Sequence, residues 1–532
     1  AASDVYKRQM SIRNKKGEKK MEQLDKMFGV TEAGSDVATE LRAGGATFLT
    51  MAYILLVNPS MLSATGIPFN DALFATSIAA FIGCMAMGLW AKLPFALAPG
   101  MGLNAFFAFT VAAPWAMAVP WDIALAAVLV QGVIFLILSL PQVGVRTAMI
   151  NAIPTDLKIA TGAGIGMFLA IIGLREMGWI AHDNATLVTL GDTASFTYES
   201  GELWAMIGLI SIAVMMARGI KGAIIFGVLG ASVAGWALSV NDPYNEGYPV
   251  IAFCIDAAAN DCVVNGNFVA GVPGEGTAEW PTKIFEFVGM PTETLGAAIG
   301  ALSLETGVVD AMTADGAYAN NLEYGLGGFL LIMITFLFVD IFDTAGTLYS
   351  VGRQAGYVDE NDELMNSNEA FMSDAAATIV GAVCGTSTTT TYIESAAGVE
   401  EGGKTGLVAV TVGVLMLSGL FLSGLFKAIP QFAMATALIV VGSLMMKQVA
   451  DIEWDNLEMA IPAFLTMVLM PFTFSIAAGI AWGVIAYVAI QILAGKAAEV
   501  NMVMWIIFAL MSMFYLGPGN ETTIEWILSH LN

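Results

Sequence analysis

Charged side chains are scarce in this chain of 532 residues, where they make up 12% of the sequence against 57% hydrophobic residues. A water-soluble domain normally carries about twice that share of charge. The mean hydropathy of +0.74 is correspondingly high. The composition therefore excludes a soluble enzyme or a soluble binding module and predicts an integral membrane protein.

Cysteine is rare as well. Four cysteines are too few for a disulfide scaffold. Cys84 and Cys384 lie in apolar stretches, where we expect them to be small packing residues. Cys254 and Cys262 lie close together in a polar segment and could form a disulfide in an oxidising compartment. The two histidines lie outside the apolar stretches, so histidine-based catalysis or metal binding has no support, and no cofactor is expected.

The N-terminal region lacks an apolar segment. Its first forty residues are polar and basic, so no cleavable signal peptide is predicted and insertion is expected to start from an internal helix. We expect residues 1–20 to be an upstream extension or a cloning remnant, with Met21 as the more natural start. The basic residues before the first apolar stretch predict a cytoplasmic N-terminus, by the positive-inside rule.

The chain does contain a long series of apolar stretches, about fourteen in number, most of them near the ~20 residues that a membrane-spanning helix needs. They cover residues 42–59, 72–91, 98–112, 122–140, 152–174, 203–217, 220–238, 327–347, 372–386, 387–399, 405–427, 430–448, 456–472 and 475–495. A further short stretch, 502–516, could span the membrane or lie in its interface. We therefore predict an all-α polytopic protein of the cell (inner) membrane.

Nearly half of the net charge of −24 lies in one segment. Residues 239–326 carry twelve acidic side chains and a single base, Lys283, whereas most other bases fall on predicted inner ends of spans. This distribution predicts that residues 239–326 form an extracytoplasmic loop. We expect its acidity to form a solvated face, and we expect no nucleic acid among the partners of the chain.

The two halves of the chain show weak self-similarity. TFLTMAYILLVNP at 47–59 resembles TFLFVDIFDTAGT at 335–347, and NAIPTDLKIATGAGIG at 151–166 resembles KAIPQFAMATALIVVG at 427–442. Because each half holds an odd number of spans, the second half is inverted relative to the first. Inverted repeats are typical of secondary transporters, which hold their substrate near the bilayer midplane between the repeats.

Two short spans are interrupted by residues that break helices or favour strands. PFALAPGMGLNAFFAF (94–109) places prolines and glycines just before Asn104. GTSTTTTYIESAAG (385–398) runs a row of hydroxyl residues into Tyr392 and Glu394. The two lie at equivalent places in the halves, as spans three and ten. We predict that each forms an extended piece followed by a half-helix, and that the two pieces pair or line a cavity.

Three carboxylates lie in or beside these spans. Asp340 and Asp343 share one face of an apolar helix, and Glu394 lies on the second broken span. An acid in a membrane helix costs several kcal/mol, so it usually faces a cavity, a partner or a proton path. Two carboxylates in one apolar site cannot both ionise cheaply, so we expect at least one to hold a proton near neutral pH, as a proton-coupled carrier requires. The alternative is that Asp340 caps a half-helix, Asp343 lies at the cytoplasmic water line and Asn104 only satisfies broken backbone.

The same set of residues suggests a ligand. Carboxylates accept N–H groups, and the Asn104 amide both donates and accepts. Tyr392, Phe106 or Phe107 could stack on a ring, with Thr391 beside them. Together they predict a site for a planar heterocycle that has N–H donors and C=O or ring-nitrogen acceptors.

These residues lie within longer motifs: TFLTMAYILLVNPSML, LPFALAPGMGLNAFFAFTV, INAIP, VDIFDTAGTLYSVG and TSTTTTYIESAAGVEEGGKTGL. The motifs resemble those of the AzgA-like purine permeases, the adenine/guanine/hypoxanthine branch of the nucleobase:cation symporters in the xanthine-uracil permease superfamily. The resemblance covers residues 22–238 and 327–495. By position, it implies substrate or proton-coupling roles for Asn104, Asp340, Asp343 and Glu394.

The resemblance also implies an architecture of fourteen spans in two inverted seven-span repeats. It further implies proton symport of purine bases, an elevator-like motion of a core domain against a gate domain, and often a homodimer. The segment 239–326 departs from the family, because it is longer and more acidic than expected. The implied parts are a core domain (42–140 and 327–427), a gate domain (141–238 and 428–495) and terminal segments (1–41 and 496–532).

Parts of the sequence also fit other functions. GVEEGGKT at 398–405 fits the phosphate-binding loop of nucleotide hydrolases, but Glu400 and Glu401 would lie against the phosphates, so we interpret it as a glycine-rich inner loop. An intramembrane aspartyl protease normally needs carboxylates on separate helices, one in a G-x-G-D context that is absent here. An anion carrier of the same fold would need bases at its site. A channel, and sodium in place of the proton, remain alternatives.

Overall fold

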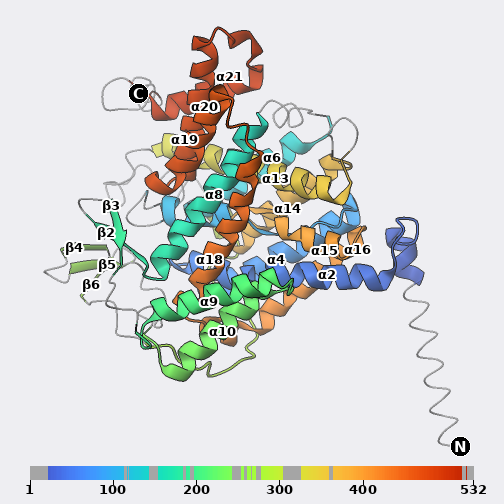
Figure 1. The fold of residues 1–532 in the computed structure, drawn as a ribbon, viewed down its shortest axis with the longest axis vertical. Coiled ribbons are helices and arrows are strands. Elements are labelled where there is room, and N and C mark those ends of the chain that lie inside the picture. Colours follow the sequence, from blue (N-terminus) through green and yellow to red (C-terminus); the bar gives the residue numbers. More distant parts are fainter. Residues whose placement is uncertain are drawn as a thin grey trace, which may run out of the picture.

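The computed structural model describes residues 22–112, 117, 119–142, 154–183, 187–191, 197–241, 253–256, 261–264, 267–270, 277–302, 325–358, 364–517 and 523 of the chain. These residues are mostly helical, with small strands at one edge of the molecule (Figure 1). Within them, seven helices are long and apolar enough to cross a membrane, and six shorter helices are apolar as well. The predicted helical membrane protein is confirmed at this level, and the shorter helices include α21 (Met502–Tyr515), which packs on α20.

A first group of helices is built on the contact between α4 and α14: α6 packs on α14 and α13 packs on α6, while α16 packs on α4 and α2 packs on α16. The broken segments at 97–111 and 389–400 belong to this group. Its helices are α2 (Val37–Met51), α3 (Ile54–Ser63), α4 (Phe69–Ala86), η1 (Met87–Ala91), α6 (Trp121–Ser139), α11 (Ala297–Ala301), α13 (Gly325–Ala355), α14 (Ser367–Cys384), α16 (Gly406–Met416), η5 (Leu417–Phe421) and α17 (Ser423–Lys427).

A second group packs around α8 and α18, and its members contact one another more than they contact the first group. The backbones of α8 and α18 touch, since a Cβ on Gly166 would lie 2.7 Å from the carbonyl oxygen of Gly442. Such small-residue crossings are typical of helices in membranes. The group comprises α8 (Thr155–Glu176), α9 (Gly201–Ala217), α10 (Ala223–Leu238), α18 (Gln431–Met446), η6 (Lys447–Asp451), α19 (Leu457–Thr473), α20 (Ile476–Leu493), η7 (Ala497–Glu499) and α21.

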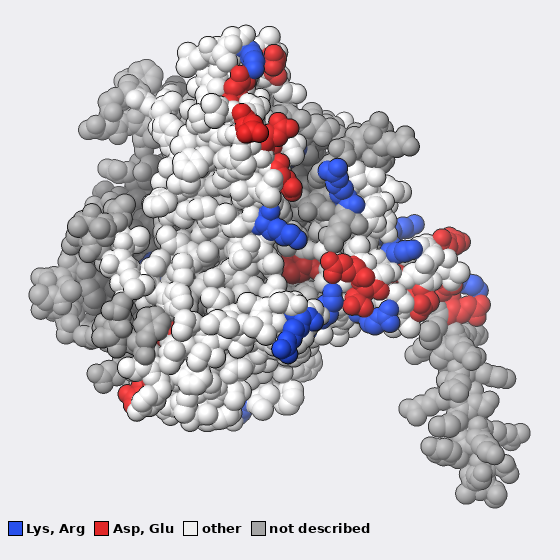
Figure 2. All heavy atoms as spheres, viewed as in Figure 1, with Lys and Arg blue, Asp and Glu red and all other residues white. Residues whose placement is uncertain are grey.

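The exterior of the molecule is largely uncharged. On the face shown in Figure 2, the acidic and basic side chains gather in a limited band, and most of the remaining described surface carries neither. Large apolar side chains point outward from helices of the second group, with Ile210 55% exposed, Phe472 65% exposed and Leu493 88% exposed. Such a surface suits lipid tails and would be unfavourable in water.

Five short strands lie at the edge of the molecule opposite α2 (Figure 1). Strand β2 (Ile180–Asp183) pairs antiparallel with β3 (Leu187–Leu190). Strands β4 (Phe253–Asp256), β5 (Asp261–Val264) and β6 (Asn267–Ala270) form an antiparallel sheet, in which Cys254 and Cys262 are register partners. The backbone thus brings together the two cysteines for which the sequence predicts a disulfide, and the bond itself stays a prediction.

Part of the segment 239–326 is anchored to the first group of helices. The carboxylate of Asp71, near the start of α4, accepts hydrogen bonds from the backbone N–H groups of Thr292, Glu293 and Thr294 at 3.1, 2.9 and 3.3 Å. The hydroxyl of Thr294 donates to the carbonyl of Cys384 at 2.8 Å. Most of the other acidic residues of the segment 239–326 lie outside the described residues.

Candidate substrate site

The two broken segments cross as a symmetric pair. Strand β1 (Leu97–Pro99) is followed by α5 (Met101–Ala105) and η2 (Phe106–Val111), and β7 (Thr389–Thr391) is followed by η4 (Ile393–Ser395) and α15 (Ala396–Glu400). The strands pair antiparallel. Gly100 N–H donates to the carbonyl of Thr388, and Tyr392 N–H donates to the carbonyl of Ala96, both at 2.9 Å. The predicted strand plus half-helix is confirmed for both segments, and the two bonds are related as an inverted repeat requires.

One side chain from a neighbouring helix holds each strand. Cys84 Sγ, on α4, accepts from the N–H of Leu97 at 3.2 Å and donates to its carbonyl at 3.3 Å. Thr378 Oγ1, on α14, accepts from the N–H of Thr389 at 3.0 Å and donates to its carbonyl at 3.1 Å. Backbone groups that a broken helix exposes are thereby satisfied, as the membrane interior demands. Cys84 is buried and free, so its predicted packing role is confirmed, and it also bonds the strand.

A cavity of about 70 Å³ opens beside this crossing. It has room for roughly five water molecules. One wall belongs to the first group of helices and consists of Tyr53, Gly100, Met101, Gly102, Asp343, Gly346, Thr347, Thr390, Thr391, Tyr392, Ile393 and Glu394. The other belongs to the second group and consists of Lys158, Gly162, Val441, Met445 and Gln448. The cavity therefore lies between the two groups.

Two of the predicted carboxylates line this cavity. Glu394 Oε1 accepts from the Tyr53 hydroxyl at 2.7 Å, and Asp343 Oδ2 accepts from the Thr390 hydroxyl at 3.4 Å. Among the described residues, neither forms an ion pair with a base. Each carboxylate therefore keeps oxygen lone pairs that could accept N–H groups from a ligand in the cavity.

Asp340 lies one helical turn from Asp343 on α13, fully buried behind the cavity wall. Gln131 Nε2, on α6, donates to Asp340 Oδ2 at 2.6 Å, and the Thr344 hydroxyl lies 3.4 Å from Oδ1 as a second donor. Gln131 Oε1 has no hydrogen-bond partner among the described residues. The structure thus divides the pair: Asp343 faces the cavity, and Asp340 bonds to α6 in the interior.

Asn104 and Phe106 also lie in the packed interior and do not line the cavity. Asn104 Nδ2 donates to the carbonyl of Pro99 at 3.3 Å, and its Oδ1 accepts from the hydroxyl of Ser387. The Phe106 ring packs edge-on against Phe336, with 5.0 Å between centroids. Asn104 therefore bonds the first half-helix to both broken segments. This arrangement agrees with the alternative interpretation, in which Asn104 satisfies the broken backbone.

Tyr392 and Thr391 line the cavity with hydroxyls that are already engaged. The Tyr392 hydroxyl donates to the carbonyl of Pro99 at 2.6 Å, so its ring is the part left for a ligand. The Thr391 hydroxyl donates to Asp374 Oδ1 at 3.1 Å. Asp374 is a fully buried carboxylate of α14 that the sequence analysis missed. Its signal was an acid near the start of a predicted apolar span. No group of three or more His, Cys, Asp or Glu residues in the described ranges could hold a metal ion.

Two residues of the second group bring N–H donors to the cavity. They are Lys158, in the first turn of α8, and Gln448, in η6. From the sequence, Lys158 is only one of the bases at predicted inner span ends, and Gln448 has no predicted role. A usable signal existed, because Lys158 lies inside a motif that recurs in the second half of the chain.

A buried carboxylate holds the glycine-rich loop that follows α15. Glu40, on α2, accepts from the backbone N–H groups of Lys404 and Thr405 at 2.9 and 3.0 Å, and from the Thr405 hydroxyl at 2.7 Å. These N–H groups would face a phosphate if the loop bound a nucleotide. Because Glu40 already occupies them, the structure supports the interpretation of 398–405 as a structural loop.

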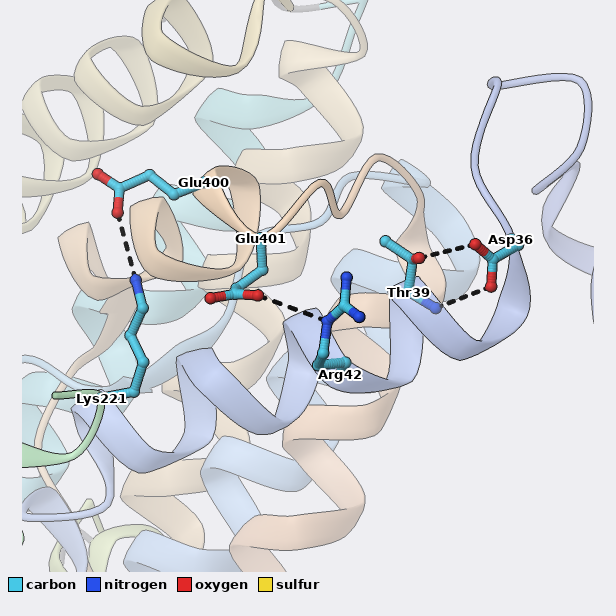
Figure 3. Close-up of polar contacts among 6 residues, drawn as sticks. All are labelled: Asp36, Thr39, Arg42, Lys221, Glu400 and Glu401. Atoms are coloured by element: carbon cyan, nitrogen blue, oxygen red, sulfur yellow. Dashed lines mark hydrogen bonds and ion pairs between the residues drawn. The ribbon is translucent and has the colours of Figure 1, made fainter. Parts of the chain in front are cut away.

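Two ion pairs flank the end of α15 (Figure 3). Lys221 Nζ, from the turn that precedes α10, lies 3.3 Å from Glu400 Oε2, and Arg42 Nε, from α2, lies 3.4 Å from Glu401 Oε2. The Arg42–Glu401 pair lies within the first group of helices. The Lys221–Glu400 pair joins the two groups, and Glu400 follows Glu394 by only a few residues in the sequence.

Comparison with known proteins identifies the family. A family model described as a permease family (Xan_ur_permease) matches residues 39–253 and 290–482. The guanine/hypoxanthine permeases PbuG and PbuO of Bacillus subtilis (strain 168) are 36% and 37% identical, each over 92% of this chain and over 98% and 99% of their own lengths. The adenine permease AdeQ of Escherichia coli (strain K12) is 36% identical over 92% of this chain and 95% of its own.

The matched residues contain both broken segments, α13, and the whole of the cavity wall described above. The relatives are named as permeases, which carry solutes and are not enzymes, so the proteolytic interpretation of the paired carboxylates is set aside. The resemblance predicted from the motifs is confirmed, and this chain belongs to the permease family.

Proposed function

We propose that this protein imports purine nucleobases, namely adenine, guanine or hypoxanthine, across the cell (inner) membrane by proton symport. The observation that carries the proposal is a cavity between two groups of helices, lined by the carboxylates of Asp343 and Glu394 beside the crossing of β1 and β7. The relatives are named as guanine/hypoxanthine and adenine permeases, and these names supply the proposed substrate class.

Recognition of the base would use the cavity wall of the first group. The carboxylates of Glu394 and Asp343 accept N–H groups of the base, and the Tyr392 ring, whose hydroxyl is fixed on Pro99, offers a face for stacking. Thr391 shapes the same wall. Asn104 and Phe106 would act from behind it, by holding the half-helix that supports the wall.

Proton coupling would use the carboxylates. Glu394 and Asp343 line one small cavity and form no ion pair among the described residues, and Asp340 lies one turn away with Asp374 interacting electrostatically with it. A carboxylate that takes up a proton outside and releases it inside can link proton flow to substrate binding, because each protonation changes which groups donate and which accept. Sodium is the alternative coupling ion, since carboxylate oxygens also bind hard cations.

Transport would proceed by an elevator-type motion of the first group, as a core domain, against the second group, as a gate domain. Because the cavity is walled by both groups, a displacement of one relative to the other would open it to one side of the membrane and then to the other. We further propose fourteen spans in two inverted repeats, a cytoplasmic N-terminus, an extracytoplasmic segment 239–326 and a homodimer.

Uptake of radiolabelled adenine, guanine, hypoxanthine, uracil and sulfate by cells that lack their own carriers tests the proposal. The expected result is saturable uptake of at least one purine, which rises at lower external pH and collapses when a protonophore is added. Uptake that follows a sodium gradient and survives the protonophore would replace the proton by sodium. Absence of purine uptake, with the protein present in the membrane, would contradict the proposed function.

A further inference from the structure

The cavity has two chemically different walls. The wall from the first group presents carboxylate oxygens of Asp343 and Glu394, which accept hydrogen bonds when ionised. The wall from the second group includes Lys158, whose ammonium only donates, and Gln448, whose amide both donates and accepts. A ligand with N–H donors on the edge that faces the first wall and acceptors on the edge that faces Lys158 would therefore find partners on both walls.

Lys158 is the one base among the lining residues of this cavity. Its side chain is partly buried, and within the described part of the chain it forms neither an ion pair nor a hydrogen bond. Two other lysines at helix ends have partners: Lys221 pairs with Glu400, and Lys496 pairs with Glu458. A cation that lines a cavity without a protein partner is suited to a ligand that carries acceptor groups.

Purine bases differ on the edge that carries N7. Guanine presents two acceptors there, O6 and N7, whereas adenine presents the N7 acceptor beside a 6-amino donor. Hypoxanthine shares the 6-oxo group of guanine. Lysine recognises the O6 and N7 pair in protein–nucleic acid complexes, and a glutamine amide matches the mixed edge of adenine. An ammonium placed against the adenine edge could still donate to N7, but it would meet the 6-amino donor in place of the O6 acceptor, which leaves that amino group without a partner.

We infer that Lys158 is a specificity-determining residue, whose ammonium donates to the O6 and N7 acceptors of a 6-oxopurine while Glu394 and Asp343 accept N–H groups on the other side. The inference rests on the proposed function and narrows it: guanine and hypoxanthine are the preferred substrates, and adenine is disfavoured. It also gives the second group of helices a direct part in recognition, so that the substrate bridges the two walls.

The test measures substrate preference rather than total activity. Uptake of radiolabelled hypoxanthine is inhibited by unlabelled guanine or adenine, in cells that express the native protein or the variants Lys158→Gln, Lys158→Arg and Lys447→Gln. Lys447 is an exposed lysine next to Gln448 that does not line the cavity, so its variant controls for the loss of one charge at this end of the molecule. Surface expression of every variant is measured in parallel, and competition binding to purified protein replaces uptake for any variant that binds but does not transport.

The native protein is expected to prefer guanine and hypoxanthine over adenine. Lys158→Gln is expected to shift the ratio of adenine to hypoxanthine affinity toward adenine by about ten- to a hundredfold, because the wrong edge now finds an amide partner. Lys158→Arg and Lys447→Gln keep the native ratio. A native preference for adenine, or an unchanged ratio in Lys158→Gln, overturns the inference while leaving purine transport intact. Equal loss of all purine binding in Lys158→Gln also overturns it, and absence of any purine uptake by the native protein refutes the proposed function instead.

Discussion

Strands β1 and β7 pair antiparallel, with Leu97 opposite Thr391 and Pro99 opposite Thr389. The backbone hydrogen bonds of the first strand recur in the second. In each strand, one residue is bonded at both its N–H and its carbonyl by one side chain of a neighbouring helix, which is α4 for the first strand and α14 for the second. Their side chains differ completely. The first strand reads Leu-Ala-Pro and leads into a half-helix that is buried throughout, whereas the second reads Thr-Thr-Thr and leads to Glu394 in the cavity.

This difference shows how one backbone pattern can carry different side-chain chemistry in its two copies. The backbone pattern is needed twice, because each broken span must satisfy the N–H and C=O groups that a continuous helix would have paired. The second segment lines the cavity with the side chains of Thr390, Tyr392 and Glu394, while the first contributes mainly backbone, through the carbonyl of Pro99 that accepts from Tyr392.

The largest expected effect comes from the carboxylates. Glu394→Gln and Asp340→Asn should reduce purine uptake to the level of cells without the carrier, with the protein still present in the membrane, because an amide can no longer exchange a proton. Glu400→Gln is the matched control on the same segment: it removes a carboxylate that is paired with Lys221 outside the cavity, and most uptake should remain. Native uptake by Glu394→Gln, measured with labelled purine, would contradict the assignment of the site to the second segment.

The sequence already predicts the crossing and much of the cavity, for physical reasons. Proline and glycine before Asn104 and a run of threonines before Glu394 disfavour a continuous helix, and in the membrane the backbone groups of such segments must find partners within the protein. Sequence alone does not predict which polar side chains face the cavity. Asp340 and Asp343 differ by one helical turn, yet only Asp343 lines it, because packing of α13 against α6 decides the rotation. Nor does periodicity reveal Lys158, since a lysine at a span end is normally attributed to topology.

A smaller effect is expected where the two segments touch most tightly. A Cβ on Gly100 would lie 2.9 Å from Thr390 Oγ1 and 3.3 Å from its Cγ2. The equivalent position of the second segment holds the large side chain of Tyr392, so the space for a side chain is restricted only at Gly100. Gly100→Ala should lower the free energy of unfolding by about 1–3 kcal/mol through overpacking. Thermal unfolding in detergent measures it, and the double variant with Thr390→Ala should recover most of the loss, which a purely conformational effect of the alanine would not do.

The two side chains that hold the strands allow a finer test. Thr378→Val keeps the shape of the side chain but leaves the buried N–H of Thr389 without its partner, at a cost of about 1–3 kcal/mol. Cys84→Ser keeps both a donor and an acceptor for Leu97, so it should change stability by less than about 1 kcal/mol. Thr378→Ser is the control on the second strand. If Thr378→Val were as stable as the native protein, the second strand would not depend on its bonds to Thr378, and the comparison with Cys84 and the first strand would fail.

The smallest effect is expected beyond the end of the second segment, where α15 meets solvent. The Lys221–Glu400 pair joins the two groups of helices, with the Lys221 side chain 33% exposed and the Glu400 side chain 59% exposed. Exposed ion pairs contribute about 0–1 kcal/mol and weaken with salt. Lys221→Gln should therefore shift the unfolding midpoint only slightly, and the difference from the native protein should vanish at about 1 M salt, where screening acts within ~3 Å. A large loss of stability that does not depend on salt would mean that the pair is shielded from solvent and holds the two groups of helices together. This contact, in addition to the cavity, would then be part of what the second segment contributes.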